Sequence, residues 1–129
     1  VYNSTATSYF RIADGIPSFH IYEFSGQTLQ YTFDYLFEAG QDYHLVFTYD
    51  PWNTKEMALW VSGIKVDSDF ATVLMRFQDQ ISWIGIGCNP SGTAPTIGNR
   101  LQGEIAEIAY YSHVLSDERI KAHYQSKDL

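Results

Sequence analysis

Hydrophobic and polar residues alternate along much of the chain, and this period of two predicts an all-β fold. The segment Gln27–Leu36 is the clearest case, because Leu29, Tyr31, Phe33 and Tyr35 share one face of a regular strand and most residues between them are polar. Turn-forming residues separate such segments roughly every 8–12 residues, as in antiparallel sandwiches. The other strands predicted in this way are Thr7–Ala13, Ser18–Phe24, Tyr43–Tyr49, Met57–Val61, Ile64–Val66 and Ile81–Cys88.

The connections between these strands have recognisable turn chemistry. Residues 14–17 predict the first turn, residues 50–54 close a hairpin between the fourth and fifth strands, and Ser62-Gly63 forms the next tight turn. Residues 67–77 have mixed character and admit a helical turn at 71–75, whereas residues 89–100 predict a long loop.

The segment Leu101–Tyr111 differs from the others because its apolar residues occupy both parities of a strand. An edge strand that faces water on one side alternates cleanly, so this pattern predicts a central strand that is covered on both sides. The apolar residues of one face are Ile105, Ala109 and Tyr111, and those of the other are Ala106, Ile108 and Tyr110.

A short helix is predicted after this strand. Ser116 is a suitable N-cap, and the two residues that follow it are acidic, which favours the positive end of the helix dipole. Leu115 and Ile120 occupy the positions of a hydrophobic staple. Ile120 and Tyr124, four residues apart, give the helix one apolar stripe that can pack on a sheet.

Four blocks of the sequence together resemble one known family. Gly103–Tyr111 followed by Val114–Ile120 resembles the C-terminal signature of laminin-G-like domains of the concanavalin-A-like lectin/glucanase superfamily. Tyr43–Asp50 is similar to that family's strand entering a hairpin, Met57–Val66 to its returning strand, and Ile84–Gly87 to the strand before its last loop. The resemblance implies an antiparallel jelly-roll β-sandwich with one short C-terminal helix.

The resemblance covers residues 40–124 and departs from the family at two positions. Ala106 occupies a position where the family very often has aspartate, and Ser62 one where asparagine is usual. The first departure weakens an inherited polar or metal site beside that strand. We expect residues 1–129 to form a single laminin-G-like domain that is part of a longer chain.

Composition limits the classes of partner. The formal charge of −7 and the scattered Lys and Arg residues argue against nucleic acid or an anionic membrane surface. No segment is long and apolar enough to predict membrane insertion. Cys88 is the single cysteine, so no disulfide can form within the domain. An acidic β-domain without disulfides is compatible with an extracellular or virion-surface location, which is our expectation.

Two glutamates are the first candidates for catalysis, because related glucanases place two carboxylates on one strand. Retaining glycosidases need them on the same face, about 5–5.5 Å apart. Glu104 and Glu107 are three residues apart, so a regular strand sends them to opposite faces. We therefore expect that the protein is not an enzyme, with a glycoside hydrolase as a remote alternative.

The histidines show no spacing typical of a transition-metal site. We expect His44 to be packed and hydrogen-bonded, and His113 and His123 to be surface groups; the fourth histidine is His20. Calcium is the metal that the family most often uses, through loop oxygens. We expect no cofactor other than calcium. Calcium binding itself is left open, because turn-forming Asp and Asn side chains often satisfy nearby backbone N–H groups instead. The candidate calcium ligands are Asp50, Asp67, Asp69 and Asn99.

Sugar recognition needs exposed aromatic faces and planar hydrogen-bonding groups. Trp52 is the strongest candidate because it lies at a turn tip beside Asn53, although packing over its own hairpin is an equal alternative. Tyr31 and Tyr35 form a platform if their face of the strand is open, and otherwise belong to the interior.

Two functions from different classes follow from these observations. The first is a non-catalytic recognition module that binds a glycan or a protein ligand. The second is a structural or assembly module, such as a decoration or fibre domain, in which aromatic faces bury against neighbouring copies in a homo-oligomer or larger assembly.

Overall fold

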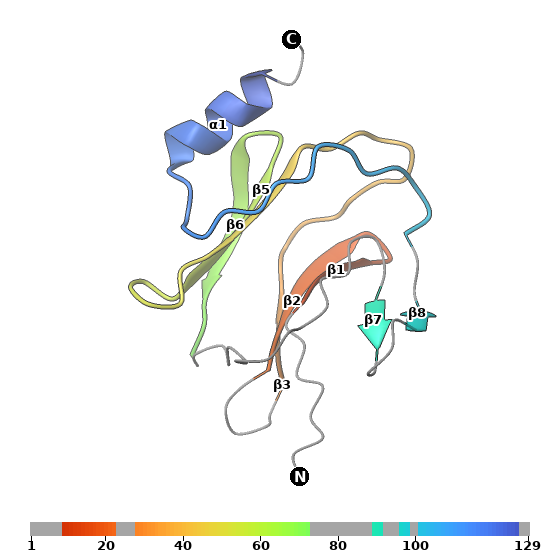
Figure 1. The fold of residues 1–129 in the computed structure, drawn as a ribbon, viewed down its shortest axis with the longest axis horizontal. Coiled ribbons are helices and arrows are strands. Elements are labelled where there is room, and N and C mark those ends of the chain that lie inside the picture. The colour runs from red at the N-terminus through yellow and green to blue at the C-terminus, as the bar shows by residue number, and fades with distance from the viewer. Residues whose placement is uncertain (1–8, 23–27, 73–88, 92–95, 99–100, 127–129) are drawn as a thin grey trace.

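The computed structural model describes residues 9–22, 28–72, 89–91, 96–98 and 101–126, which form two three-stranded antiparallel sheets, one two-stranded sheet and one helix (Figure 1). The protein is therefore mostly β, with a short C-terminal helix, as the sequence predicts. Among the described residues, no helix has the length and hydropathy needed to cross a membrane.

The first sheet has the strand order β1-β2-β3, with both pairs antiparallel. Asp14 and Gly15 make a two-residue turn with positive φ angles of 52° and 78°. Gly15 is required there because a Cβ atom would lie 2.5 Å from the carbonyl oxygen of Phe37. The strands are β1 (Tyr9–Ala13), β2 (Ile16–Tyr22) and β3 (Thr28–Thr32).

The second sheet has the strand order β4-β5-β6, again antiparallel. Ser62 and Gly63, with φ angles of 51° and 77°, form the tight turn between β5 and β6. The β5–β6 register shifts between Leu59 and Trp60, which marks a bulge in this pair. The strands are β4 (Leu45–Tyr49), β5 (Glu56–Val61) and β6 (Ile64–Phe70).

The main core lies where the two sheets pack against each other. Phe19 of β2 contacts Phe47 of β4 with ring centroids 4.5 Å apart, and Met57 and Leu59 are completely buried. Burying a side chain of this size stabilises the fold by about 1.5–3 kcal/mol. The buried members of this cluster are Phe19, Phe33, Met57, Leu59, Val61 and Ala71.

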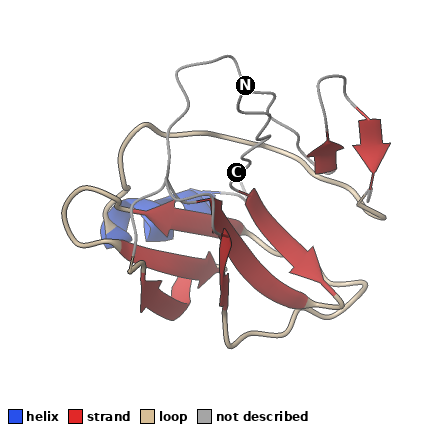
Figure 2. Cartoon of the chain, turned by 90° about the horizontal axis from the view of Figure 1, so that it is seen from below, coloured by secondary structure: helices blue, strands red, loops and turns tan. Residues whose placement is uncertain are grey.

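The helix α1 (Asp117–Gln125) covers the opposite face of β5. Its Ile120 is fully buried against Ala58 and Trp60, which are 1% and 3% exposed. Both faces of β5 are thus buried, one by the first sheet and the other by the helix. Figure 2 shows α1 on one side of the strands and the two short strands β7 and β8 apart from the others.

The strand prediction for Leu101–Tyr111 is wrong. Residues 101–116 contain no strand, and Ile105, Ile108 and Tyr110 are 49%, 56% and 90% exposed. A strand with this pattern needs a packed layer on each face, and the backbone breaks the extended run at Glu107, whose φ is 54°. The two-sided burial expected of this segment belongs instead to β5, whose residues 57–61 are all buried.

Other boundaries differ in smaller ways. Ile16 and Pro17 belong to β2 rather than to the first turn, and β6 continues to Phe70. The predicted loop at 89–100 contains β7 (Asn89–Ser91) and β8 (Thr96–Gly98), which pair with each other. The predicted strand at residues 81–88, the lone Cys88 and most of the helical turn at 71–75 lie outside the described residues.

Candidate functional site

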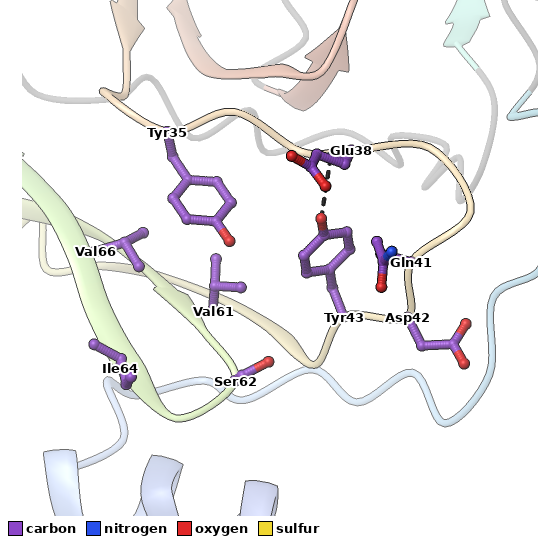
Figure 3. A pocket seen from close by; sticks show the side chains of 9 residues that line it. All are labelled: Tyr35, Glu38, Gln41, Asp42, Tyr43, Val61, Ser62, Ile64 and Val66. Carbon is purple, nitrogen blue, oxygen red and sulfur yellow. Dashed lines mark hydrogen bonds between the residues drawn. The ribbon is translucent and has the colours of Figure 1, made fainter.

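A shallow depression of about 440 Å³ lies between the loop that follows β3 and the turn that joins β5 to β6 (Figure 3). We call it the Tyr35–Tyr43 depression. Two tyrosine rings, two carboxylates and one carboxamide line it together with an apolar strand end. Its lining residues are Tyr35, Glu38, Gln41, Asp42, Tyr43, Val61, Ser62, Ile64 and Val66.

A cluster of three aromatic rings, Tyr35, Phe37 and Tyr43, holds the two tyrosines in place. Phe37 lies between them, edge-on to Tyr35 at 4.8 Å and to Tyr43 at 4.9 Å. The Phe37 amide N–H donates to the Gly15 carbonyl at 2.7 Å, so this part of the loop is tied to the first sheet. Both tyrosines are half-buried, as amphipathic rings in a binding surface often are.

The Tyr43 hydroxyl also shapes the acidic part of the loop. It accepts a hydrogen bond of 3.0 Å from the Glu38 amide N–H, which closes the loop around Gly40 (Figure 3). Gly40 has a φ of 78°, a conformation that glycine adopts without strain. Glu38, Gln41 and Asp42 are consequently exposed at the rim of the depression.

The apolar side of the depression comes from the second sheet. Val61 is buried at the end of β5, and Ile64 and Val66 follow on β6. The Ser62 hydroxyl lies at the turn between them. The depression therefore combines an apolar wall, two rings and several hydrogen-bonding groups on a shallow surface.

Of the predicted ligand-binding residues, Tyr35 alone lines this depression. Tyr31 packs against the main core, and its hydroxyl accepts a hydrogen bond of 3.0 Å from the Thr72 amide N–H. Tyr31 and Tyr35 both pack against the main core and are both half-buried, so ligand contact by Tyr31 stays a prediction. Tyr35 also borders a second depression of about 470 Å³ beside Ile16 and Leu36.

Trp52 and Asn53 lie together at the other end of the β4–β5 hairpin. Trp52 is 72% exposed, and Asn53 donates from its backbone and side-chain nitrogens to Asp50 Oδ1 at 3.2 Å and 3.3 Å. The five residues of β4 separate them from Tyr43, a length of about 16 Å. A ligand contact by Trp52 therefore remains a prediction, for a site distinct from the depression.

Asp50 organises its own turn. Its Oδ2 accepts from the backbone N–H and the hydroxyl of Thr54, both at 3.3 Å. Partial desolvation raises the pKa of Asp50, but the hydrogen bonds from Asn53 and Thr54 outweigh this effect and hold it below the ordinary 3.8. This carboxylate has the turn-forming role that was the alternative to calcium binding.

Asp67 and Asp69 are likewise bound to backbone N–H groups. Asp67 accepts from Asp34 N at 2.7 Å and from Ser68 N at 2.8 Å, and Asp69 accepts from Phe70 N at 2.7 Å. Within the described residues, no three His, Cys, Asp or Glu side chains gather as metal ligands. Asn99 lies outside those residues, so calcium binding remains a prediction.

The catalytic and histidine candidates lie elsewhere. Glu104 and Glu107 are exposed in the segment that is not a strand, and neither lines the two depressions described above. The His44 ring is half-buried and lies 5.7 Å from Tyr124, as its predicted packing role requires. His113 is exposed, whereas His123 is half-buried near Tyr111 rather than fully on the surface.

A comparison with protein families decides which family the chain belongs to. A family model described as the concanavalin A-like lectin/glucanases superfamily matches residues 2–121. The chain belongs to this superfamily. The match confirms the laminin-G-like resemblance that was read from four sequence blocks, and it extends that resemblance over most of the chain.

The laminin-G-like domain is also similar to a solved structure. This is the 2.1 Å crystal structure of an S-layer domain-containing protein (residues 221–444) from Clostridium thermocellum ATCC 27405, with a TM-score of 0.55 and 16% sequence identity. The match covers 96% of the laminin-G-like domain but 66% of the other chain, and at this identity it concerns the fold alone. No curated protein matches the chain.

The sequence offered little direct signal for the depression. Glu38, Gln41, Asp42 and Tyr43 read as a turn followed by the start of a strand. The signal that could have located the depression is the concentration of acidic, amide and aromatic residues in one turn between two aromatic segments. Such a turn exposes its polar groups beside rings that the flanking segments hold in place.

Proposed function

We propose that this laminin-G-like domain is a non-catalytic recognition module of a cell-surface or extracellular protein, and that it binds a glycan in the Tyr35–Tyr43 depression. The observation that carries this proposal is the lining itself. Two half-buried tyrosine rings offer faces for the C–H surface of a pyranose, and the groups around them can pair with hydroxyls.

The positions of the polar groups support binding more than chemistry. The Gln41 carboxamide and the Ser62 hydroxyl come from different segments on the rim of one depression. Glu38 and Asp42 are both exposed, whereas the acid catalyst of glycoside cleavage typically lies in a buried, apolar environment. Membership of a superfamily that includes glucanases does not itself assign a reaction, because function depends on the site rather than the fold.

The family also supports a jelly-roll connection of the sheets and a location outside the cell, either on a cell surface or on a virion. The S-layer description of the solved relative is in keeping with a cell surface, although it belongs to that protein. The jelly-roll connection and the location outside the cell are both part of the proposal.

The experiment is a titration of the domain with a panel of soluble oligosaccharides, in which NMR or calorimetry measures binding. We expect one sugar class to bind the domain and Gln41→Ala to weaken that binding. The matched control is Gln30→Ala, because Gln30 is an exposed glutamine on β3 that does not line the depression. Repeating the titration with a chelator tests calcium: loss of binding that added Ca²⁺ restores would establish a metal site.

An assembly module is the second candidate, and the exposed apolar residues after Leu101 favour it. Leu101, Ile105, Ile108 and Val114 are 45–56% exposed within one short segment. Apolar groups concentrated in this way are typical of surfaces that bind another protein. Light scattering that shows oligomers, together with no binding in the oligosaccharide panel, would favour assembly over glycan recognition.

A further inference from the structure

We infer that the Tyr35–Tyr43 depression selects a positively charged glycan, namely one whose sugar units carry free amino groups. This inference rests on the proposed function and adds the chemical class of the ligand. It is carried by the combination of two carboxylates and two tyrosine rings in the lining, to which no Lys or Arg of the described residues contributes.

The described residues that line the depression carry a net negative charge. Glu38 and Asp42 are exposed on its rim, and its lining contains neither Lys nor Arg within the part of the chain that the structure describes. The nearest basic residue along β6, Lys65, is engaged elsewhere: its Nζ lies 3.1 Å from Glu56 Oε1 and 5.2 Å from the centre of the Trp60 ring. An ammonium group on a ligand can therefore pair with these carboxylates, which no Lys or Arg in the described lining engages.

The rings add a second attraction for a cation. An ammonium group near the face of a tyrosine is attracted by the negative charge of the ring, and the effect grows when the group loses water. Tyr35 and Tyr43 are both half-buried, so each ring is fixed by packing against Phe37 while part of it remains accessible. A neutral sugar would gain the ring contact without this charge contribution.

Tyr43 also sets the position of one carboxylate. Its oxygen accepts the Glu38 amide N–H at 3.0 Å, which fixes the backbone from which the Glu38 side chain extends. Among the described residues the hydroxyl proton of Tyr43 has no acceptor of its own. It remains able to donate to a sugar oxygen while Glu38 accepts from an amine.

An amino sugar uses this lining more fully than a lysine side chain does. A single ammonium group would engage the carboxylates and a ring, but it would leave the Gln41 carboxamide and the Ser62 hydroxyl without a partner. A volume of about 440 Å³ also exceeds what one alkylammonium group needs. A sugar ring with an amine and several hydroxyls offers a partner for each of these kinds of group.

The experiment compares three hexasaccharides by calorimetry at one salt concentration and at a pH where amines are protonated. They are the β-1,4-linked oligomers of glucosamine, N-acetylglucosamine and glucose. We expect the glucosamine oligomer to bind roughly tenfold more tightly than the other two, since hydrogen bonds to charged groups are stronger than neutral ones. The double variant Glu38→Gln, Asp42→Asn should remove this preference.

A matched double variant controls for bulk attraction to an acidic protein. Glu118→Gln, Asp117→Asn removes the same two residue types from exposed positions of α1 outside the depression. It should keep the preference, and a loss of preference in this control as well would overturn the inference. A lysine hexapeptide that competes with the glucosamine oligomer at equal affinity would overturn the assignment to a sugar.

The two proposals fail differently in this experiment. Equal affinity for all three hexasaccharides overturns the inference and leaves glycan recognition in place. No binding of any oligosaccharide, by a domain whose circular dichroism shows that it is folded, overturns both.

Discussion

At the scale of single residues, Ser62 occupies a backbone conformation that serine adopts reluctantly. Its φ of 51° and the φ of 77° at Gly63 define a two-residue turn that matches the twist of β5 and β6. Gly63 has a second reason for its identity, because a Cβ atom there would lie 3.1 Å from Tyr124 Cδ1 of the helix. Ser62 is half-buried in the same turn, and a residue that tolerates positive φ can relieve its conformational cost.

We predict that Ser62→Asn stabilises the domain by about 0.5–1 kcal/mol, because asparagine tolerates positive φ better than serine. Urea denaturation measures the change in midpoint. Ser68→Asn is the control, since Ser68 is an exposed residue in the regular part of β6, where asparagine has no such advantage. A lower midpoint for Ser62→Asn would contradict the explanation from backbone strain.

At the scale of elements, the docking of α1 depends on where the helix begins. Ser116 caps it by accepting the Arg119 N–H at 3.3 Å, and the half-buried Leu115 packs beside Ile120, as a hydrophobic staple requires. The pKa of Glu118 is lowered by its own backbone N–H and then by the Ser116 hydroxyl. One serine thus supports both the first turn and the apolar contact that covers Trp60.

We predict that Ser116→Ala lowers the free energy of unfolding by about 1 kcal/mol through loss of the cap. Ser116→Asp should restore most of the stability, because aspartate is an equally good N-cap. Ser112→Ala serves as the control at an exposed serine outside the helix. Thermal or urea unfolding followed by circular dichroism measures all three, and equal effects at positions 116 and 112 would argue against the cap.

The elements that the sequence predicted well are those fixed by local chemistry. The β4–β5 hairpin, the Ser62-Gly63 turn and the start of α1 each depend on residues close together in the chain. The segment Leu101–Tyr111 was mispredicted because its strand pattern needs neighbouring strands, which a periodicity cannot supply. At β5, in contrast, the apolar residues of both faces are buried, one face by the first sheet and the other by the helix.

At the scale of the whole molecule, the candidate site was the feature that the sequence predicted least well. Tyr35 was identified from its alternating position, but Tyr43 and Glu38 come together only because the loop folds back through a hydrogen bond between them. Val61 and Ser62 reach the same depression from a different sheet. Their proximity follows from how the sheets pack, which no local spacing encodes.

Global stability should depend on pH through one buried histidine. His20 is 8% exposed, its ring is stacked on Tyr9 at 4.4 Å, and its Nε2 lies 3.3 Å from the Ser18 hydroxyl. Burial, and then the positive charge of Arg11, lower the pKa of His20 below its ordinary 6.5. The imidazole is therefore neutral in the folded state at a pH where the unfolded chain already binds a proton.

The sign of the effect follows from this difference in bound protons. The stability that neutral His20 contributes is fully present above pH 6.5. It decreases as the pH falls below that value, because the unfolded chain then binds a proton that the folded chain does not. Asp50 and Glu118 act at lower pH, since their lowered pKa values stabilise the fold until these carboxylates begin to take up protons. The loss between pH 6.5 and 5 should therefore come mainly from the histidine.

We predict that urea midpoints measured between pH 7.5 and 5 fall for the native sequence and that His20→Gln removes most of the slope. Glutamine can retain a hydrogen bond to Ser18 but cannot titrate, so the variant starts from a lower stability and changes little with pH. His113→Gln is the control at an exposed histidine and should leave the slope unchanged. If His20→Gln keeps the full slope, another group carries the pH dependence, and the neutral buried state assigned to His20 is wrong.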